Sequence, residues 1–226
     1  MTELPVSERT QVTRHPERQA RERALLDQLL DEALIAHVGI VRDGFPVVLP
    51  FACARDGDSL LLHGSTGGML LRAAAIGPVA ATITHLDGLV VARTTFESSM
   101  NYRSAVVHGV PEVLEGEEKV AALNTLSDHL IPGRMSEVAT HTRKELAATL
   151  VLRLPLTEVS VKVSTGPPSI EDDLTRDAWA GVLPLYLEAG TPVPYDGSGE
   201  PPPSVIAVIT RLRAIADRAV AEAESI

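Results

Sequence analysis

The residues best suited to chemistry lie in the segment His63-Gly64-Ser65-Thr66-Gly67-Gly68. The apolar run before it predicts a strand and the run after it a short helix, so the chain turns here from one to the other. Such a turn aims backbone N–H groups and two hydroxyls at one point, and its glycines let an anion approach closely. Arg72, one helical turn later, could add positive charge. The segment is a candidate phosphate site, with a plain turn as the alternative.

His63 is the candidate catalytic residue, because it ends the predicted strand beside these glycines; a hydrogen-bonded structural histidine is the alternative. The histidines never fall at His-x-x-x-His spacing, and none lies within a few residues of the single cysteine, Cys53. One cysteine can form neither an intramolecular disulfide nor a thiolate cluster. We therefore expect no metal site from neighbouring residues, and redox chemistry would need an organic cofactor.

Two further residues could contact a ligand. The segment Asn101-Tyr102-Arg103-Ser104 opens a predicted long strand, which puts Tyr102 and Arg103 on opposite faces. Arg103 could grip a phosphate or pair with a surface carboxylate, and the spacing leaves both open. Trp179, the only tryptophan, could stack on a planar ring or anchor the chain to the rest of the fold.

Charge and pattern exclude several classes of protein. The formal net charge of -10 opposes a nucleic-acid backbone, and no basic run with interleaved aromatics is present. No stretch approaches the roughly 20 apolar residues of a membrane span, and the N-terminal residues lack an apolar signal core. We therefore expect a cytoplasmic protein. Neither a Gly-x-Ser-x-Gly elbow nor a Gly-x-Gly-x-x-Gly turn occurs, so hydrolase and Rossmann signatures are missing.

Periodicity and turn residues predict a fold that is mainly β with covering helices. Asp43-Gly44 marks a hairpin turn, and Asp87-Gly88 leaves open whether its segment is one strand or a hairpin. The predicted strands are 35–41, 45–54, 59–62, 79–92, 102–114 and 151–163, and the predicted helices are 16–34, 69–75, 115–130, 136–150 and 204–224. We expect a six-stranded antiparallel barrel over residues 1–165.

Residues 166–226 are expected to form an arm that packs on the barrel or on a partner subunit. Its many prolines, such as Pro167, Pro168 and Pro184, remove the backbone donors that a regular sheet or a long helix needs. Within this arm, only residues 204–224 are predicted to form a helix. The acidic cluster Glu171-Asp172-Asp173 is interpreted as a solvated face or a helix start.

Several segments in this order resemble the FMN-binding split-barrel flavoproteins related to pyridoxamine 5'-phosphate oxidase, in the branch of Nim-type nitroimidazole reductases. The segments are Asp43-Gly44-Phe45-Pro46-Val47-Val48-Leu49-Pro50, Leu61-Leu62-His63-Gly64-Ser65, Tyr102-Arg103-Ser104-Ala105-Val106-Val107-His108-Gly109, His129-Leu130-Ile131-Pro132-Gly133-Arg134, and Lys162 to Pro168 followed by Trp179-Ala180-Gly181-Val182-Leu183-Pro184. The resemblance spans about residues 16–184.

The resemblance implies a homodimer with FMN in a cleft between the subunits, and an oxidoreductase acting on a small aromatic or nitro-bearing acceptor. It places the cofactor-binding residues in four groups. Beside the flavin ring lie Val47, Val48, Leu49 and Pro50; at the ribityl phosphate lie His63, Gly64, Ser65, Thr66, Gly67 and Gly68, with Arg72; closing the pocket are Tyr102, Arg103 and Ser104; and folding back from the tail are Lys162 and Trp179.

The sequence also departs from the family pattern. In the true oxidase, an arginine and a lysine bracket the strand that corresponds to residues 47–52, and a Ser-Arg-Lys unit takes the place of Gly67-Gly68-Met69. This sequence lacks all of these cations. It also has Ser164 where relatives commonly have arginine. Oxidation of pyridoxamine phosphate itself is therefore not expected. Two alternatives stay open: a non-catalytic flavin storage or sensing protein, and a split barrel that binds haem or a deazaflavin, with His63 or His108 ligating haem.

Overall fold

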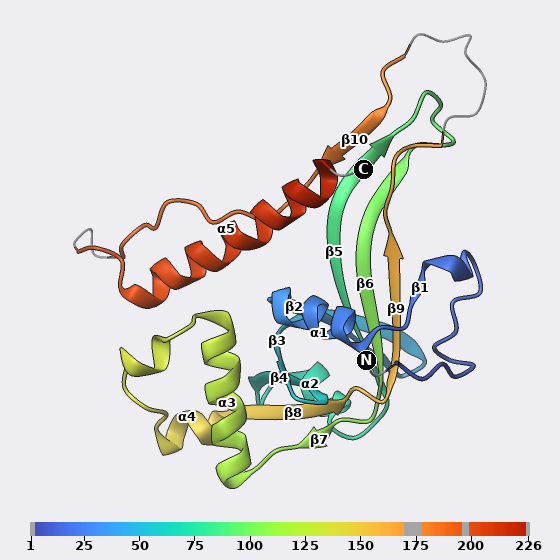
Figure 1. Ribbon diagram of the computed structural model, residues 1–226. Helices are drawn as coiled ribbons and strands as arrows, with labels where there is room; N and C mark the ends of the chain where they lie inside the picture. The colour runs from blue at the N-terminus through green and yellow to red at the C-terminus, as the bar shows by residue number, and fades with distance from the viewer. Residues whose placement is uncertain (1–2, 170–177, 196–198, 225–226) are drawn as a thin grey trace.

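The computed structural model describes residues 3–169, 178–195 and 199–224, and an antiparallel sheet dominates them (Figure 1). Ten strands of these residues pair in the order β1-β9-β6-β5-β2-β3-β4-β8-β7, with β10 beside β5. The strands are β1 Gln19–Ala20, β2 Ile35–Arg42, β3 Phe45–Asp56, β4 Ser59–Ser65, β5 Val79–Val91, β6 Ser99–Gly109, β7 Glu112–Val113, β8 Thr149–Pro155, β9 Glu158–Ser164 and β10 Gly181–Pro184.

Strand β3 is the element that joins the two halves of the sheet. Its first part pairs with β2, from Phe45 opposite Arg42 to Ala52 opposite Ile35, and its last part pairs with β4. The β2–β3 turn consists of Asp43 and Gly44, with φ values of 51° and 81°. Two successive positive φ values are those of a type I′ turn, whose twist suits a two-residue hairpin. The predicted hairpin around Asp43-Gly44 is confirmed.

The helices cover the sheet on different sides. They are α1 Arg23–Glu32, α2 Met69–Ala74, α3 Gly116–Leu130, α4 Arg143–Ala148 and α5 Pro203–Glu224, with 3-10 turns at Pro16–Arg18 and Arg134–Ser136. Leucines of α1 and α2 pack with the strands in the main core. A second, smaller core lies under α3, where Leu123 and Leu126 meet Leu61 of β4 and Val151 of β8.

Helix α5 is tied to the body through polar contacts along its length. Ser204 Oγ donates to Glu137 at 2.6 Å, Arg211 donates to the His129 carbonyl oxygen, and Arg218 pairs with Glu32 of α1 at 2.9 Å. Among its described side chains, Leu212 and Ala216 are the buried apolar ones. None of the helices in the described residues is long and apolar enough to cross a membrane.

The prediction of a mainly antiparallel sheet with helices is confirmed, but the count of six strands is wrong. Segment 151–163 forms two strands, β8 and β9, because Pro155 ends β8 and the chain turns through Leu156 and Thr157. Asp87-Gly88 is no hairpin turn, since β5 runs through it as one strand with a register irregularity between Leu86 and Gly88.

Three further elements differ from the prediction. The first α-helix begins at Arg23 and not near Pro16, because Gln19 and Ala20 pair with β9 first. The helix expected over 136–150 is only Arg143–Ala148, started by a Thr142–Glu145 capping box. The proline-rich arm contains strand β10, since its prolines leave Val182 and Leu183 free to pair with β5. The boundary at residue 165 remains a prediction.

Candidate functional site

Residues 63–65 end β4 and residues 66–68 form the turn after it, and the backbone N–H groups of this turn all have acceptors. The N–H of Thr66 donates to Ala148 O at 2.9 Å, that of Gly67 to Ser65 Oγ at 3.1 Å, and that of Gly68 to Ser65 O at 2.8 Å. These amides are therefore not free to bind an anion in this conformation. Arg72 is exposed on α2, whose six residues make only a short helix. The assignment of this turn and of Arg72 to a phosphate stays a prediction.

His63 lies on the side of β4 that faces helix α3. It pairs directly with Val151 of β8, and paired residues of an antiparallel ladder project to the same side. Val151 belongs to the core under α3. The His63 side chain is half-buried, and its Nδ1 is buried without a hydrogen-bond partner in the part of the chain that the structure describes. Burial lowers the pKa of His63, which favours the neutral imidazole.

A second group of predicted site residues shares the opposite, outward face of the sheet. On β6 and β9, Ser104 pairs with Lys162, and Tyr102 lies two residues from Ser104 and projects to the same side. His37 of β2 pairs with Thr82 of β5 on one side and with Pro50 of β3 on the other, so the side chain of Pro50 projects to this same face. Val48, two residues before Pro50 on β3, projects to it as well. We call Val48, Pro50, Tyr102, Ser104 and Lys162 the outward face.

Val47 and Leu49 alternate to the other side of β3, and Val47 packs against the main core. The four residues 47–50 of the predicted flavin strand are therefore divided between two faces. Lys162 Nζ donates to the Arg14 carbonyl oxygen at 3.4 Å, a long contact that leaves most of its hydrogen-bonding capacity available. The end of β4 lies close to this part of β3, since a Cβ on Gly64 would come within 3.6 Å of the Phe51 ring.

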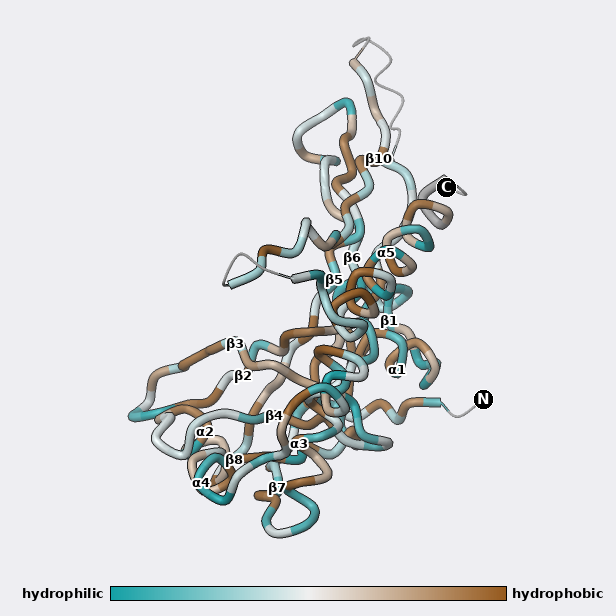
Figure 2. Tube along the Cα trace, turned by 90° about the vertical axis from the view of Figure 1, so that its left-hand side faces the viewer, coloured by the Kyte–Doolittle hydropathy of each residue, from teal (hydrophilic) through white to brown (hydrophobic). Residues whose placement is uncertain are grey.

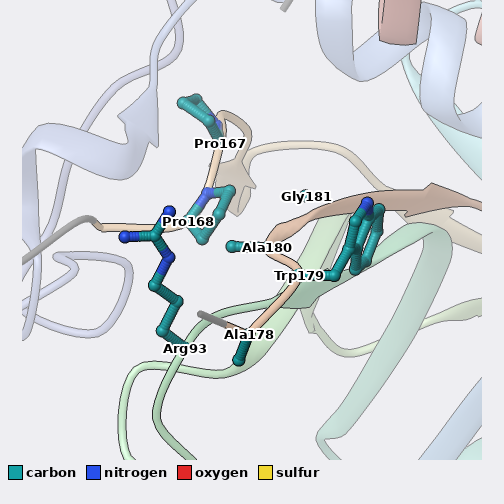
Figure 3. Close-up of a pocket in the computed structure, with 7 residues that line it drawn as sticks. All are labelled: Arg93, Pro167, Pro168, Ala178, Trp179, Ala180 and Gly181. Carbon is teal, nitrogen blue, oxygen red and sulfur yellow. The ribbon is translucent and has the colours of Figure 1, made fainter. Parts of the chain in front are cut away.

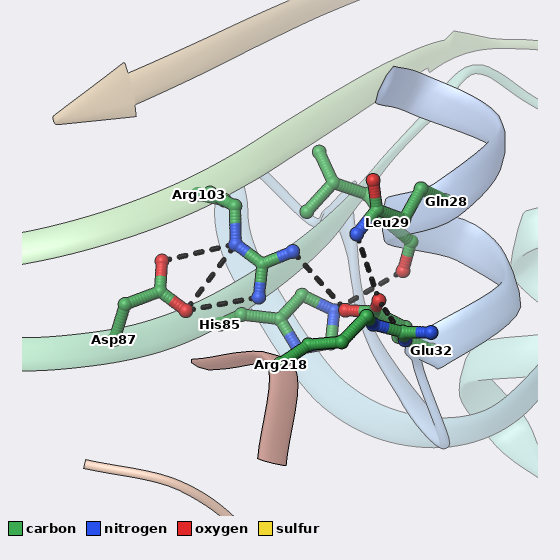
Figure 4. A network of polar contacts seen from close by, with 7 residues as sticks. All are labelled: Gln28, Leu29, Glu32, His85, Asp87, Arg103 and Arg218. Atoms are coloured by element: carbon green, nitrogen blue, oxygen red, sulfur yellow. Dashed lines mark hydrogen bonds and ion pairs between the residues drawn. The ribbon is translucent and has the colours of Figure 1, made fainter. Parts of the chain in front are cut away.

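Arg103 lies on the inner side of β6 and is engaged by carboxylates (Figure 4). Its Nη2 donates to Asp87 at 2.9 Å and its Nη1 to Glu32 at 3.1 Å, and Glu32 also receives Arg218 from α5. Burial by itself would raise the pKa of Glu32, but hydrogen bonds from Gln28 and Arg103 hold it below its usual value. Arg103 and Tyr102 do lie on opposite faces, as predicted. The phosphate role of Arg103 remains a prediction, and its present partners are carboxylates.

The β2–β3 hairpin projects from the body (Figure 2), and apolar side chains on it are exposed. Val41 is 76%, Phe45 73% and Val48 59% exposed. Val41 pairs with Pro46 and so lies on the same side as Val48, whereas Phe45 projects to the other side. Exposed apolar surface of this kind is typical of an interaction site. Val48 belongs to the outward face, so the hairpin continues that face toward its tip.

Trp179 lines a recess of about 630 Å³ at the far end of β5, together with a residue that sequence reasoning missed, Arg93 (Figure 3). Arg93 follows the end of β5, and Trp179 precedes β10, which pairs with β5. Only that pairing brings the two together, and no local pattern predicted β10. Among the described residues, no cluster of three or more metal-ligating side chains occurs.

Comparisons with known proteins show the family and similar folds. Residues 22–163 match the family model for pyridoxamine 5'-phosphate oxidase. The FAD and haem binding protein from Mycobacterium smegmatis is similar in structure, with a TM-score of 0.81 and 45% identity over 85% of this chain and 97% of that one. The flavocytochrome Anf3 from Azotobacter vinelandii has a TM-score of 0.83 and 33% identity over 89% of this chain and 96% of that one. No curated protein sequence matches the chain.

Proposed function

Because the chain belongs to the pyridoxamine 5'-phosphate oxidase family, we propose that it is a flavin-binding redox protein that also binds haem. Two similar structures support this proposal, since one is named for FAD and haem and the other as a flavocytochrome. FMN, the flavin that the sequence resemblance implied, is the alternative to FAD. Flavin and haem together would supply electron transfer, with the protein providing binding and orientation.

The observation that carries the haem part of the proposal is the state of His63. Its imidazole is half-buried, and Nδ1 is buried with no partner among residues 3–169, 178–195 and 199–224. The lowered pKa favours the uncharged ring, which is the form that ligates a metal. A neutral histidine with a free ring nitrogen would hold haem iron through that nitrogen. This side chain therefore fits the group.

For the flavin, the outward face fits better than the turn at residues 63–68. Tyr102 and Ser104 offer hydroxyls, and Lys162 offers an ammonium group beside Ser104. The amides of Thr66, Gly67 and Gly68 already donate to Ala148 and Ser65, so they offer a phosphate less than the sequence suggested. We propose that Tyr102, Ser104 and Lys162 orient the flavin, and that Val48 and Pro50 exclude water from its ring.

The proposed assembly is a homodimer in which the outward faces of two copies enclose the flavin. This is supported by the exposed apolar hairpin, which continues the outward face and which a monomer would leave in water. We place the protein in the cytoplasm, in keeping with its single, fully buried cysteine.

The substrate side of the proposal rests on the sequence resemblance. A small aromatic or nitro-bearing acceptor would receive electrons from the reduced protein, which makes it an oxidoreductase. The alternative is a flavin storage or sensing protein, which would bind the cofactors and turn over no acceptor. Steady-state reduction of a nitroaromatic by the loaded protein would decide for the first.

The experiment that tests the cofactor proposal is an absorption spectrum of protein produced with haem supplied to the culture. We expect the flavin bands together with a Soret band. In a His63→Ala variant the Soret band should be lost while the flavin bands persist, because the axial ligand is removed and the outward face is unchanged.

His108→Ala is the matched control. His108 is also half-buried but lies on the outward face, opposite Ala80, and was the other candidate ligand. It should retain the Soret band. Loss of the band in His108→Ala alone would show that the haem ligand is His108 on the outward face. Protein that takes up neither flavin nor haem would overturn the proposal.

A further inference from the structure

The recess at the far end of β5 combines an arginine, an exposed tryptophan and prolines (Figure 3). Its lining residues are Arg93, Pro167, Pro168, Ala178, Trp179, Ala180 and Gly181, and its volume is about 630 Å³. None of these residues belongs to the outward face, to the turn at residues 63–68 or to the Arg103 network. The recess is therefore a separate feature of the protomer.

Strand pairing brings the arginine and the tryptophan to corresponding positions. Gly181 of β10 pairs with Val91 of β5, and Arg93 and Trp179 each lie two residues beyond that pair. The loop that carries Arg93 is held by Ser98, whose hydroxyl accepts from the Ala92 N–H at 3.2 Å and donates to Thr94 O at 2.9 Å. The recess is thus fixed on its β5 side by the ladder and by this loop.

The Gly166-Pro167-Pro168 segment forms the other wall. Asn101, which is 5% exposed, donates through its side-chain amide to Gly166 O at 3.0 Å. Gly166 has a φ of 123°, a value that favours glycine, and it turns the chain so that the two prolines line the recess. A buried side chain therefore holds this wall in place.

Arg93 has unused hydrogen-bonding capacity in this recess. Its Nε is buried and has no hydrogen-bond partner among the residues that the structure describes. A buried donor without a partner is costly, so such an atom indicates a missing acceptor. A guanidinium recognises phosphate through paired N–H groups. The group that would satisfy Arg93 is therefore an anion such as phosphate.

Trp179 offers a flat apolar surface near that cation. It is 68% exposed, which is unusual for a large aromatic residue without a binding role. A Cβ on Gly181 would lie 2.8 Å from Trp179 Cζ2, so the absence of a side chain at Gly181 lets the indole lie across the backbone. Figure 3 shows the guanidinium beside Pro168 and the indole over Gly181, at two different places along the recess. A ligand that contacts both needs an aromatic part and an anionic part.

We propose that this recess binds the adenosine phosphate end of a dinucleotide flavin, with Trp179 stacking on the adenine and Arg93 pairing with the phosphate. This inference rests on the proposed flavin binding and adds a choice between the two flavins. FMN ends at its single phosphate and has no adenine for Trp179. Arg93 and Trp179 are therefore the residues that select FAD over FMN.

The test compares FAD and FMN binding to the full chain freed of flavin. The wild type should bind FAD at least about tenfold more tightly than FMN, since base stacking and a charge-assisted phosphate contact each contribute on that scale. Arg93→Gln and Trp179→Ala should each weaken FAD binding about tenfold and leave FMN binding unchanged. Trp179→Phe should restore most of the loss, because a phenyl ring still stacks. Arg213→Gln, at an exposed position of α5, is the control with the same charge change.

A second readout uses the fact that Trp179 is the only tryptophan. Titrating ADP into the flavin-free protein should change its fluorescence, and Arg93→Gln should shift that titration to higher ADP. Equal affinity for FAD and FMN, with no response to ADP, would overturn the inference and leave the proposed function standing. If neither flavin binds, the proposed function fails. An ADP response would then still support the recess as a nucleotide site, whereas no response to ADP would overturn the inference as well as the proposed function.

Discussion

Cys53 and His63 are both covered by the fold, and burial has opposite consequences for their reactivity. Cys53 is fully buried in the main core, and burial raises the pKa of its thiol to about 12. The thiolate is the reactive form of cysteine, so this residue is inert in the folded protein. His63 keeps a neutral imidazole with a free nitrogen, which is its ligating form.

The first prediction concerns the thiol. At pH 8, Ellman's reagent should modify no thiol of the folded protein and one thiol after unfolding in guanidinium chloride. The native rate should be at least about a thousandfold below the denatured rate, because the reagent must wait for an opening of the core that costs about 5 kcal/mol or more. A thiol that reacts within seconds in native buffer would contradict the placement of Cys53.

The second prediction concerns the pH dependence of stability in haem-free protein. The pKa of His63 is lower in the folded than in the unfolded chain, so the unfolded state binds more protons below about pH 6.5. The His63 contribution to stability is therefore complete above that pH and is lost as the pH falls toward the lowered pKa. The melting temperature of the wild type should drop more between pH 7.5 and 5.5 than that of His63→Gln.

The exposed His37 provides the comparison for this experiment. His37→Gln makes the same chemical change at an exposed position, and its curve is compared with that of His63→Gln. Parallel curves for the wild type and His63→Gln would show that His63 does not lose solvation on folding.

Among the site residues, those with a distinctive local context could be found from the sequence. His63 ends a strand beside glycines, and Trp179 is the only tryptophan, so both were candidates. Arg93 was not a candidate, because its place in the recess depends on the wall at residues 166–168 and on the pairing of β10 with β5. The proline content of that segment argued against such a strand. The acceptor for Thr66 is equally invisible in the sequence, since Ala148 is the last residue of α4.

At the scale of elements, Arg103 connects three parts of the fold: β5, β6 and α1, with α5 joining through Arg218. The guanidinium is 14% exposed and the Glu32 side chain 6%. Removing one partner from a buried ion pair leaves an uncompensated charge, which costs more than the pair contributes. The network is therefore a point at which a single change affects several elements.

The third prediction follows from this network. Arg103→Met should lower the free energy of unfolding by about 3 kcal/mol in urea titrations at pH 7. Without Arg103, burial should raise the pKa of Glu32, so the deficit should shrink as the pH falls and Glu32 takes up a proton. The triple change Glu32→Gln, Asp87→Asn and Arg103→Met should recover much of the loss. A single variant within 0.5 kcal/mol of the wild type, taken as about the effect of a surface change, would contradict the structural role.

Which elements could be predicted depended on how local their causes are. The Asp43-Gly44 hairpin and α5 follow from turn chemistry and periodicity within the segment, and both were correct. The predicted start of the first α-helix was wrong, because the residues just before Arg23 form β1 and pair with β9. The predicted length of α4 was wrong, because a capping box at Thr142 starts that helix. The break between β8 and β9 was missed although Pro155 signals it, since alternation continues on both sides.

At the scale of the whole molecule, we propose that the outward face forms the interface of a dimer. Val48, 59% exposed, lies on this face, and Val41, which pairs with Pro46, extends the apolar surface along the same hairpin. Soluble monomers rarely leave a contiguous apolar patch of this kind uncovered. In a two-fold dimer each patch would meet its own copy, so one substitution alters the interface twice.

The fourth prediction is that the wild type sediments as a dimer at micromolar concentration and that Val48→Asp sediments as a monomer. Two buried, unpaired carboxylates would face each other across the interface, and the dissociation constant should rise at least about a hundredfold, since each uncompensated charge costs several kcal/mol. Ile76→Asp, at an apolar position that is 87% exposed and follows α2, is the control and should remain dimeric.

If the flavin lies between the subunits, Val48→Asp should also lose flavin, whereas Arg93→Gln should not change the sedimentation coefficient. A wild type that stays monomeric at all concentrations, with flavin bound, would place the cofactor within one protomer and remove the dimer from the proposal.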